Sequence, residues 1–182
     1  MTTRTRSRIY VSLAAMILTA ALAVPAAAQT SCADSGAGCF KGTFEGEDAH
    51  DVLPPDATTV VIHTTATGRG THLGRFSLIR EITGNLTNFS ATGSANWIAA
   101  NRDSIHTTVF GQAELSDRYG GSLKVTEIHI ITGGTGRFTG AQGSFTVVLF
   151  HQLAVSGVAG GVETHEIVGS FHGTITFPHP AR

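Results

Sequence analysis

The feature that most constrains this fold is a series of short runs rich in Thr, Val, Ile and Phe, which fill the chain from about residue 38 onward. Apolar and polar residues alternate within these runs, as in a half-buried strand, and the 3.6-residue period of an amphipathic helix is absent. Glycine, asparagine and aspartate separate the runs and indicate turns. The sequence therefore predicts strands over residues 38–47, 58–67, 72–82, 86–99, 104–115, 122–132, 143–153 and 164–177.

Consecutive strands joined mostly by short turns favour an all-β fold, a closed antiparallel up-and-down barrel of about eight strands, because closure removes the exposed edges of the sheet. A sandwich of two sheets is the alternative. The 22 glycines of the chain, several of them inside predicted strands, suit the sharp coiling and bulges of a small barrel. The polar segment 48–56, with Pro54 and Pro55, is either a crossover between strands, which we favour, or a flap over one barrel mouth.

The N-terminus has the layout of a secretory signal peptide. Arg4, Arg6 and Arg8 precede an apolar run over about residues 9–24, which is followed by the small residues 26–28. This run is short and alanine-rich for a membrane span, which needs roughly 20 strongly apolar residues, so a membrane anchor is the weaker alternative. We expect cleavage before Gln29, a single domain over residues 29–182, and a secreted or periplasmic protein. The residues before Cys32 do not match a lipid-attachment site.

The net charge limits the classes of molecule that this chain can bind, and the cysteine content indicates a disulfide. The predicted signal removes three of the 12 basic residues and none of the 13 acidic ones, which leaves a net charge of −4. A mildly acidic domain without a basic run is a poor candidate for binding nucleic acid or an anionic membrane. Cys32 and Cys39 lie at the start of the exported part, where disulfides persist, and we expect them to form one short disulfide-closed loop.

The most distinctive stretch is residues 131–145, which reads ITGGTGRFTGAQGSF. It resembles the GGTGRF-x-GA-x-G signature of the allene oxide cyclase barrel-like proteins and, more loosely, of the dirigent proteins. Residues 71–76, THLGRF, are similar to an early strand of bacterial members of that group. The resemblance implies a calycin-like barrel that holds an apolar or polyunsaturated small molecule. In some members the barrel steers a reactive substrate through ring closure without a cofactor.

The same stretch is also accounted for by local structure, with no need for catalysis. We expect Gly133, Gly134 and Gly136 to take positive φ in a tight hairpin, Phe138 to cap the barrel end, and Gly140 and Gly143 to admit a bulge. The lysine and helix of a phosphate-binding loop are missing, and the glycine spacing does not fit a dinucleotide site.

Residues 125–131 offer the strongest candidates for catalysis. Alternation places Glu127 and His129 on one face, with Val125 and Ile131, and Ile128 and Ile130 on the other. If the first face is internal, burial raises the pKa of Glu127 and makes proton transfer plausible. The alternative is that Glu127 and His129 point to solvent while the isoleucines fill the core. A cyclase role predicts that at least one of the pair faces inward.

Other candidates for a ligand pocket come from the remaining strands. Trp97 shares a face with small residues and is expected to pack across the interior or line a cavity. His151 ends an apolar face near a barrel end, His165 is expected at the inner rim, and Tyr119 lies in a turn. Ordinary core packing competes with ligand binding at each of these positions.

No cofactor or metal site is expected from motifs. The nine histidines include no His-x-His or His-Glu-x-x-His pair, although ligands from separate strands could still assemble a site. Two functions therefore remain: a cofactor-free cyclase or isomerase that acts on a small hydrophobic substrate, and a non-catalytic lipocalin-like binder of a small hydrophobic ligand. A filled barrel that associates through its outer surface is a third alternative, and the sequence is compatible with an oligomer.

Overall fold

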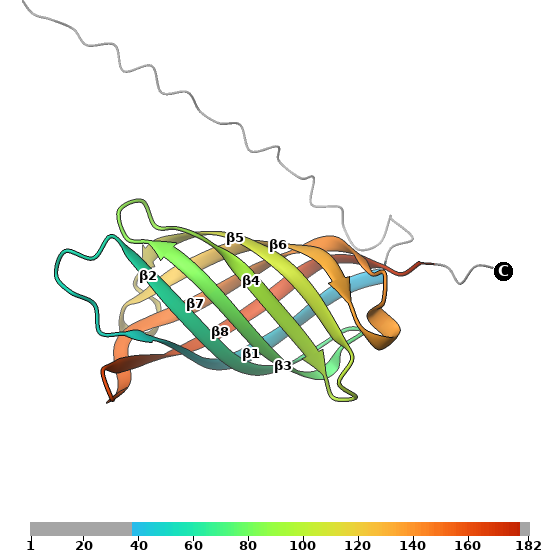
Figure 1. Ribbon diagram of the computed structural model, residues 1–182, viewed down its shortest axis with the longest axis horizontal. Coiled ribbons are helices and arrows are strands. Elements are labelled where there is room, and N and C mark those ends of the chain that lie inside the picture. Colours follow the sequence, from blue (N-terminus) through green and yellow to red (C-terminus); the bar gives the residue numbers. More distant parts are fainter. Residues whose placement is uncertain (1–37, 179–182) are drawn as a thin grey trace, which may run out of the picture.

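Successive side chains of each strand point to opposite faces of the sheet, one mainly apolar and one mainly polar. The sheet closes into a barrel, so that the apolar face lies inside. The structure is a computed structural model, and it describes residues 38–178. Eight strands follow one another around a closed antiparallel barrel, with β1 also paired to β8 (Figure 1). The strands are β1 (Gly38–Asp51), β2 (Thr59–Gly70), β3 (Gly74–Asn85), β4 (Ser90–Ala99), β5 (Ser104–Ser116), β6 (Ser122–Gly134), β7 (Gln142–Ala159) and β8 (Val162–Thr176).

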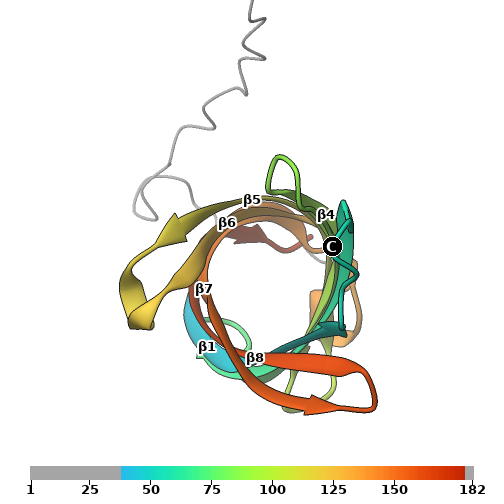
Figure 2. The same ribbon diagram turned by 90° about the vertical axis from the view of Figure 1, so that its left-hand side faces the viewer.

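The predicted all-β barrel is confirmed, and most strand ranges agree within a few residues. Two single-turn 3₁₀ helices, η1 (Arg118–Gly120) and η2 (Gly136–Phe138), lie in the connections beside β6. The largest differences are at strand ends: β1 continues to Asp51 and β7 to Ala159 because their pairing with β8 continues to Val162. In Figure 2, viewed along the barrel, the strands form a closed ring from which the β7–β8 and β5–β6 hairpins project.

The two barrel ends differ. One end, which we call the capped end, carries the start of β1, the end of β8, η2 and the β2–β3 and β4–β5 turns. The other end, which we call the mouth, carries the β1–β2 loop and the β3–β4, β5–β6 and β7–β8 connections (Figure 1). Residues 52–58 join β1 to β2, which are neighbouring antiparallel strands, so the predicted irregular segment is not a crossover, and its first four residues belong to β1.

Aromatic side chains fill the half of the barrel near the capped end. Trp97 is fully buried, and its ring lies 5.0–6.0 Å, centroid to centroid, from four phenylalanine rings, those of Phe44, Phe76, Phe145 and Phe171. Gly169 makes room for this packing, because a Cβ there would overlap the ring of Phe44. The expected packing of Trp97 across the interior is confirmed, and this half of the barrel is a solid core.

The glycine-rich hairpin covers the capped end, and the expectations for it are confirmed in part. Phe138 is fully buried there, and Gly136 has φ +55°, with the Asp103 carboxylate occupying the space of a Cβ. Gly133 and Gly134 do not take positive φ but belong to β6, whereas Gly140 and Gly143 do take it.

The predicted signal segment 1–28 and Cys32 lie outside the described residues, so the cleavage site and the Cys32–Cys39 disulfide remain predictions. Within residues 38–178, no helix is long and apolar enough to cross a membrane.

Candidate functional site

Polar side chains form a layer inside the barrel, between the aromatic core and the mouth. Asp48, Thr64 and Arg80 are direct cross-strand neighbours on β1, β2 and β3, so their side chains lie side by side on the inner face. Glu127 and His129 face them from β6, and His151 from β7. All six residues are buried, and we call them the charged layer.

Arg80 is the centre of this layer. Its Nη1 donates to Glu127 Oε1 at 2.5 Å, its Nη2 lies 3.3 Å from Asp48 Oδ2, and its Nε donates to Thr64 Oγ1 at 2.6 Å. The Thr64 hydroxyl in turn donates to Asp48 Oδ1. A buried guanidinium requires such partners, because an unpaired charge in a protein interior costs several kcal/mol. The arginine therefore cross-links opposite walls of the barrel.

Glu127 and His129 face inward, each with a side chain only 1% to 2% exposed, while Ile128 and Ile130 point outward. The alternative that placed Glu127 and His129 in solvent is wrong. His129 Nε2 lies 3.1 Å from Glu127 Oε2, and its Nδ1 lies 3.0 Å from the Thr107 hydroxyl. Because a carboxylate only accepts, Nε2 carries a proton, and the Thr107 hydroxyl pairs with Nδ1.

The ionisation states differ from the sequence-based expectation. Burial raises the pKa of Glu127, but the nearby Arg80 and the hydrogen bond from His129 outweigh it, so the pKa is lowered. The expected increase is wrong because it did not include Arg80. Burial lowers the pKa of His129 in spite of its carboxylate neighbour. The Glu127–His129 pair is therefore a carboxylate beside a neutral imidazole.

Asp48 is the second carboxylate of the charged layer, and it contacts Arg80, Thr64 and His151. Burial acts against its charge, but Arg80 and hydrogen bonds from His151 and Thr64 lower its pKa to about 2. His151 Nδ1 lies 3.0 Å from Asp48 Oδ2, and because a carboxylate only accepts, Nδ1 donates this hydrogen bond. Two carboxylates against one guanidinium leave the layer with one negative charge in excess when its histidines are neutral.

A cavity of about 90 Å³ lies between this layer and the mouth. Its floor is formed by Asp48, Arg80, Glu127 and His151. Its walls and rim are mainly apolar, with Val60, Ile62, Ile82, Leu86, Phe89, Ala91, Ala113, Leu123 and Val125, and they also include Gly84, Asn85 and Ser90. We call this cavity the mouth pocket.

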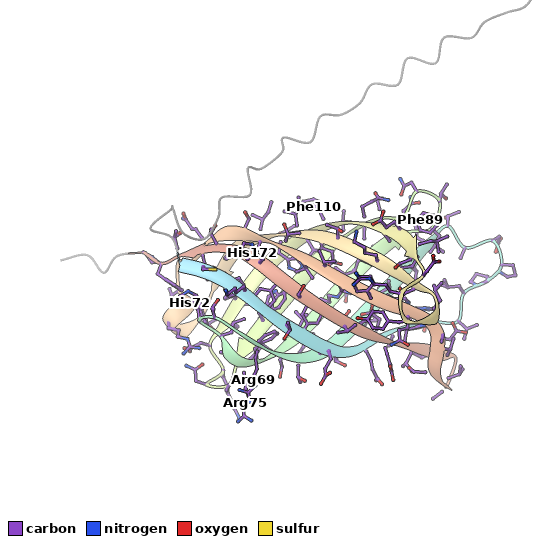
Figure 3. The ribbon with its side chains drawn as sticks, turned by 180° about the vertical axis from the view of Figure 1, so that it is seen from behind. Arg69, His72, Arg75, Phe89, Phe110 and His172 are labelled. Atoms are coloured by element: carbon purple, nitrogen blue, oxygen red, sulfur yellow. The ribbon has the colours of Figure 1, made fainter. Side chains whose placement is uncertain are left out.

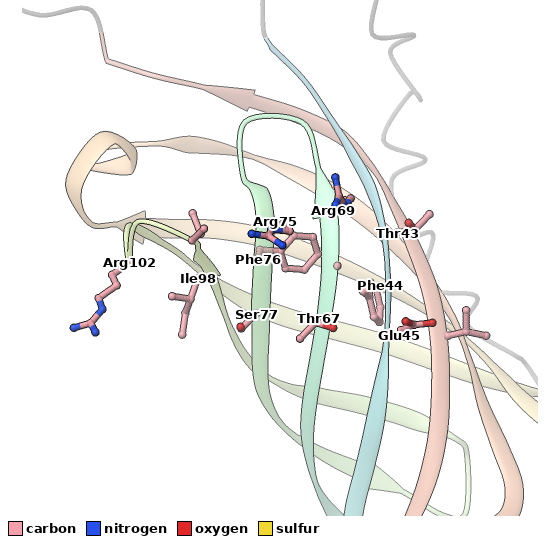
Figure 4. A pocket seen from close by; sticks show the side chains of 14 residues that line it. Thr43, Phe44, Glu45, Thr67, Arg69, Arg75, Phe76, Ser77, Ile98 and Arg102 are labelled. Carbon is pink, nitrogen blue, oxygen red and sulfur yellow. The ribbon is translucent and has the colours of Figure 1, made fainter.

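A larger hollow, of about 820 Å³, lies on the outer surface of β1–β4. Figure 4 shows Arg69, Arg75 and Arg102 around it, and Figure 3 shows Arg69 and Arg75 pointing away from the barrel. These arginines lie at the surface, and the two buried aromatic side chains, Phe44 and Phe76, belong to the core. The residues that line this outer hollow include no buried ionisable group, so we do not assign it as the site.

The structure brings together most of the predicted site residues. Glu127 and His151 line the mouth pocket. His129 forms a hydrogen bond with Glu127, and the ring of His165 lies beside that of His151, with centroids 4.7 Å apart. Trp97 contacts His129 but lies in the solid core. Tyr119 is 55% exposed and packs on Phe150, on the outside of β7, so it does not line the mouth pocket.

Sequence reasoning missed Asp48, Thr64 and Arg80. Alternation carried a signal for the arginine, because Phe76, Leu78 and Ile82 share its face of β3 and a lone arginine in an otherwise apolar face indicates a buried charge. Asp48 follows Phe44 by four residues on the inner face of β1, although the sequence predicts an irregular segment there. The contacts that bring Arg80 and Asp48 together with Glu127 depend on closure of the barrel, which the local sequence pattern does not describe.

Comparisons with known proteins add little to this description. No protein-family model matches the chain, and no curated protein matches it. Among solved structures, one that matches is that of a pterocarpan synthase dirigent protein, with 11% sequence identity over 80% of this chain and 97% of that one, and a TM-score of 0.21.

Proposed function

We propose that this barrel binds a small, mainly apolar molecule in the mouth pocket, with a neutral hydrogen-bonding group of that molecule against the charged layer. The observation that carries the proposal is an apolar cavity whose floor consists of four buried ionisable residues. Pockets with apolar walls and a few converging polar groups are typical of small-molecule sites.

The volume of the mouth pocket limits how much of a ligand it can enclose. A cavity of about 90 Å³ corresponds to about three water molecules at roughly 30 Å³ each. A larger ligand would therefore place only its polar end inside and extend past Leu86 and Phe89, which are 37% and 43% exposed at the rim. This geometry favours a binding role over enclosure of a long substrate, because the aromatic core occupies the rest of the barrel.

The charged layer also determines which polar group of the ligand it can accept. Its two carboxylates accept hydrogen bonds, and against the single guanidinium of Arg80 they give it an excess of negative charge. A ligand that donates a hydrogen bond, such as an alcohol or phenol, fits this floor, whereas a carboxylate is repelled.

The binding test uses three matched probes, 4-ethylphenol, ethylbenzene and 4-ethylbenzoate, measured by calorimetry or by chemical-shift titration. We expect 4-ethylphenol to bind about 2- to 10-fold more tightly than ethylbenzene, the value of one net hydrogen bond, and 4-ethylbenzoate to bind most weakly. Ala91→Leu fills the mouth pocket and should abolish binding. Ala100→Leu, at the exposed β4–β5 turn, is the control. Equal binding by Ala91→Leu and the wild type would refute the proposal.

A second candidate function, steering of ring closure or isomerisation, is favoured by the charges that are fixed at the pocket floor. Preorganised charges stabilise developing charge in a substrate without reorganisation during the reaction. In this version Asp48 holds His151 in one orientation, and Glu127 with His129 holds Arg80. Isomerisation conserves mass, so the test is incubation with a lipophilic extract of the host, followed by a search for compounds whose retention changes at constant mass. Loss of such conversion in His151→Gln would support this function, and absence of any conversion by the wild type would reject it.

The proposed setting is outside the cytoplasm, in the secreted or periplasmic space, after removal of residues 1–28. Native mass spectrometry of the protein recovered from its own host tests ligand and setting together, because it measures both the mature N-terminus and any small molecule that co-purifies.

A further inference from the structure

A second group of side chains, separate from the mouth pocket, lies on the inner face of β1 and β8 at the mouth. His50 pairs directly with Glu163 in the β1–β8 register, and His165 lies two residues further along β8 on the same face as Glu163. One ligand atom from each of the three side chains lies within 4.8 Å of those of the other two. None of the three lines the mouth pocket.

The histidines are held in the orientation that metal-binding histidines adopt. His50 Nδ1 lies 2.8 Å from the carbonyl oxygen of Asp51, and His165 Nδ1 lies 3.0 Å from the carbonyl oxygen of Gln152. Because a carbonyl only accepts, each Nδ1 carries a proton, so Nε2 is the ring nitrogen left to coordinate an ion. Metal-ligating histidines usually donate their second ring nitrogen in this way, which fixes the tautomer and the ring orientation.

His165 also has an unused ligand atom. Its side chain is only 7% exposed, and its Nε2 is buried with no hydrogen-bond partner among the described residues. The closest carboxylate oxygen is Glu163 Oε2 at 4.0 Å, which is too long for a hydrogen bond. Buried polar atoms in folded proteins nearly always have a partner, and coordination of an ion would give this lone pair one.

We propose that His50, Glu163 and His165 bind a divalent transition-metal ion of the Zn²⁺ type. Two imidazole nitrogens and one carboxylate oxygen form a ligand set that zinc uses when three protein ligands leave a fourth position open. Ligand atoms about 2.1 Å from a tetrahedral ion lie about 3.4 Å apart, so the present separations, at most 4.8 Å, need to shrink by up to about 1.4 Å. His50 and Glu163, both only partly buried, can supply this movement by side-chain rotation.

The position of this site relates it to the charged layer without making it part of that layer. The ring of His165 lies between two other imidazoles: that of His151, which lines the mouth pocket, at 4.7 Å, and that of His50, which stacks on it at 5.2 Å. An ion bound here would sit next to the pocket entrance, with its open coordination position available to water or to a ligand atom. The inference does not depend on the proposed binding function.

The test is Zn²⁺ titration of the untagged, chelator-stripped protein by calorimetry, with Co²⁺ absorption spectra as a measure of tetrahedral geometry. We expect one Zn²⁺ per chain. Loss of a residue that only supports a metal ligand weakens metal affinity by about 10- to 100-fold, so loss of a direct ligand in His50→Ala, Glu163→Gln or His165→Ala should weaken it by about 100-fold or more. Because His165→Ala removes a buried side chain, thermal unfolding without metal checks that this variant is folded. If it is not folded, His50→Ala and Glu163→Gln still decide the test.

The matched control is His63→Gln. His63 also lies near a carboxylate, with Nδ1 3.6 Å from Glu81 Oε2, but both side chains are more than 60% exposed, and they belong to no group of three ligand residues in the described part of the chain. Its Zn²⁺ affinity should equal that of the wild type. The proposal is overturned if the wild type does not bind Zn²⁺ stoichiometrically, or if His50→Ala and Glu163→Gln bind as tightly as His63→Gln, since the ion would then belong to other groups.

Discussion

Replacement of Arg80 by methionine tests the charged layer most directly. Methionine keeps an unbranched apolar side chain in the same place but removes the guanidinium that contacts Glu127, Asp48 and Thr64. Asp48 and Glu127, both 1% exposed, then remain buried without their counter-charge. The Arg80→Met variant must either keep unpaired charges in the interior or protonate them.

Protonation is the less costly response, and its free energy follows from the pH. A carboxyl group with an ordinary pKa near 4 costs about 4 kcal/mol to protonate at pH 7, at about 1.4 kcal/mol per pH unit. Neutralising one or both carboxylates therefore costs about 4 to 8 kcal/mol at pH 7 and only about 1 to 2 kcal/mol at pH 4.5. Whole domains are stable by about 5 to 15 kcal/mol, so Arg80→Met should be barely folded at neutral pH.

Between pH 7 and 4.5 Glu127 should affect the stability of the two proteins differently: it leaves that of the wild type nearly unchanged and makes that of Arg80→Met increase as the pH falls. Folding lowers the pKa of Glu127 in the wild type, so its pairing stabilises the fold above about pH 4.5 and is lost as the pH falls through the folded pKa. In Arg80→Met, burial without the guanidinium raises the pKa of Glu127, and stability should increase as the pH falls from 7 to 4.5. Urea unfolding at both pH values, in buffer with a chelator, measures the difference.

Two further variants separate charge from packing. Arg80→Met/Glu127→Gln removes one of the two unpaired carboxylates and should recover about 4 kcal/mol of the loss at pH 7. Arg69→Met removes an exposed arginine from β2 and should change stability by less than about 0.5 kcal/mol. A loss in Arg80→Met that is below about 1 kcal/mol at pH 7, or that is the same at pH 4.5, would refute the assignment of two buried carboxylates paired through Arg80.

Three other predictions concern the core and the chain ends. Trp97→Ala should destabilise the barrel by about 3 to 5 kcal/mol in urea unfolding, because it empties the centre of the aromatic cluster. Gly169→Ala should cost about 1 to 3 kcal/mol, since its Cβ overlaps the ring of Phe44, whereas the neighbouring outward Ser170→Ala should cost little; equal effects would contradict the packing. The intact mass of the protein from its host should match a chain that begins at Gln29 and lacks two hydrogens, as a Cys32–Cys39 disulfide requires; a free thiol or another N-terminus would reject the predicted processing.

The fold could be predicted because its signals are local. Alternation within each run separates the two faces of β6, β7 and β8, and the turn residues set the strand order, so closure followed from the number of strands. The alternation also places Glu127 and His129 on one face, but it could not decide whether that face is internal. That decision depends on Arg80, which makes an inward Glu127 stable, and the two residues are far apart in sequence.

The same limit accounts for the errors in the chemistry. Val125 and Ile131, on the same face of β6 as Glu127, are apolar, and local pattern alone therefore predicts a raised pKa for this carboxyl group. The guanidinium that lowers it comes from β3, and the carboxylate that shares this guanidinium comes from β1. Likewise, His50 and His165 form no motif in the sequence, since their proximity exists only in the β1–β8 register that closes the barrel.

The position of the charged layer argues that it is not present for stability. Buried ion pairs are often no more stabilising than apolar residues of the same volume, because desolvation offsets their attraction. The half of the barrel near the capped end illustrates the apolar solution, with Trp97 buried against four phenylalanine rings. The charges occur where that packing stops, at the floor of the mouth pocket. A layer with little net effect on stability that forms the polar end of a cavity supports the proposal that the mouth pocket binds a ligand. Loss of Arg80 alone is still costly, because it leaves two carboxylates buried without their counter-charge.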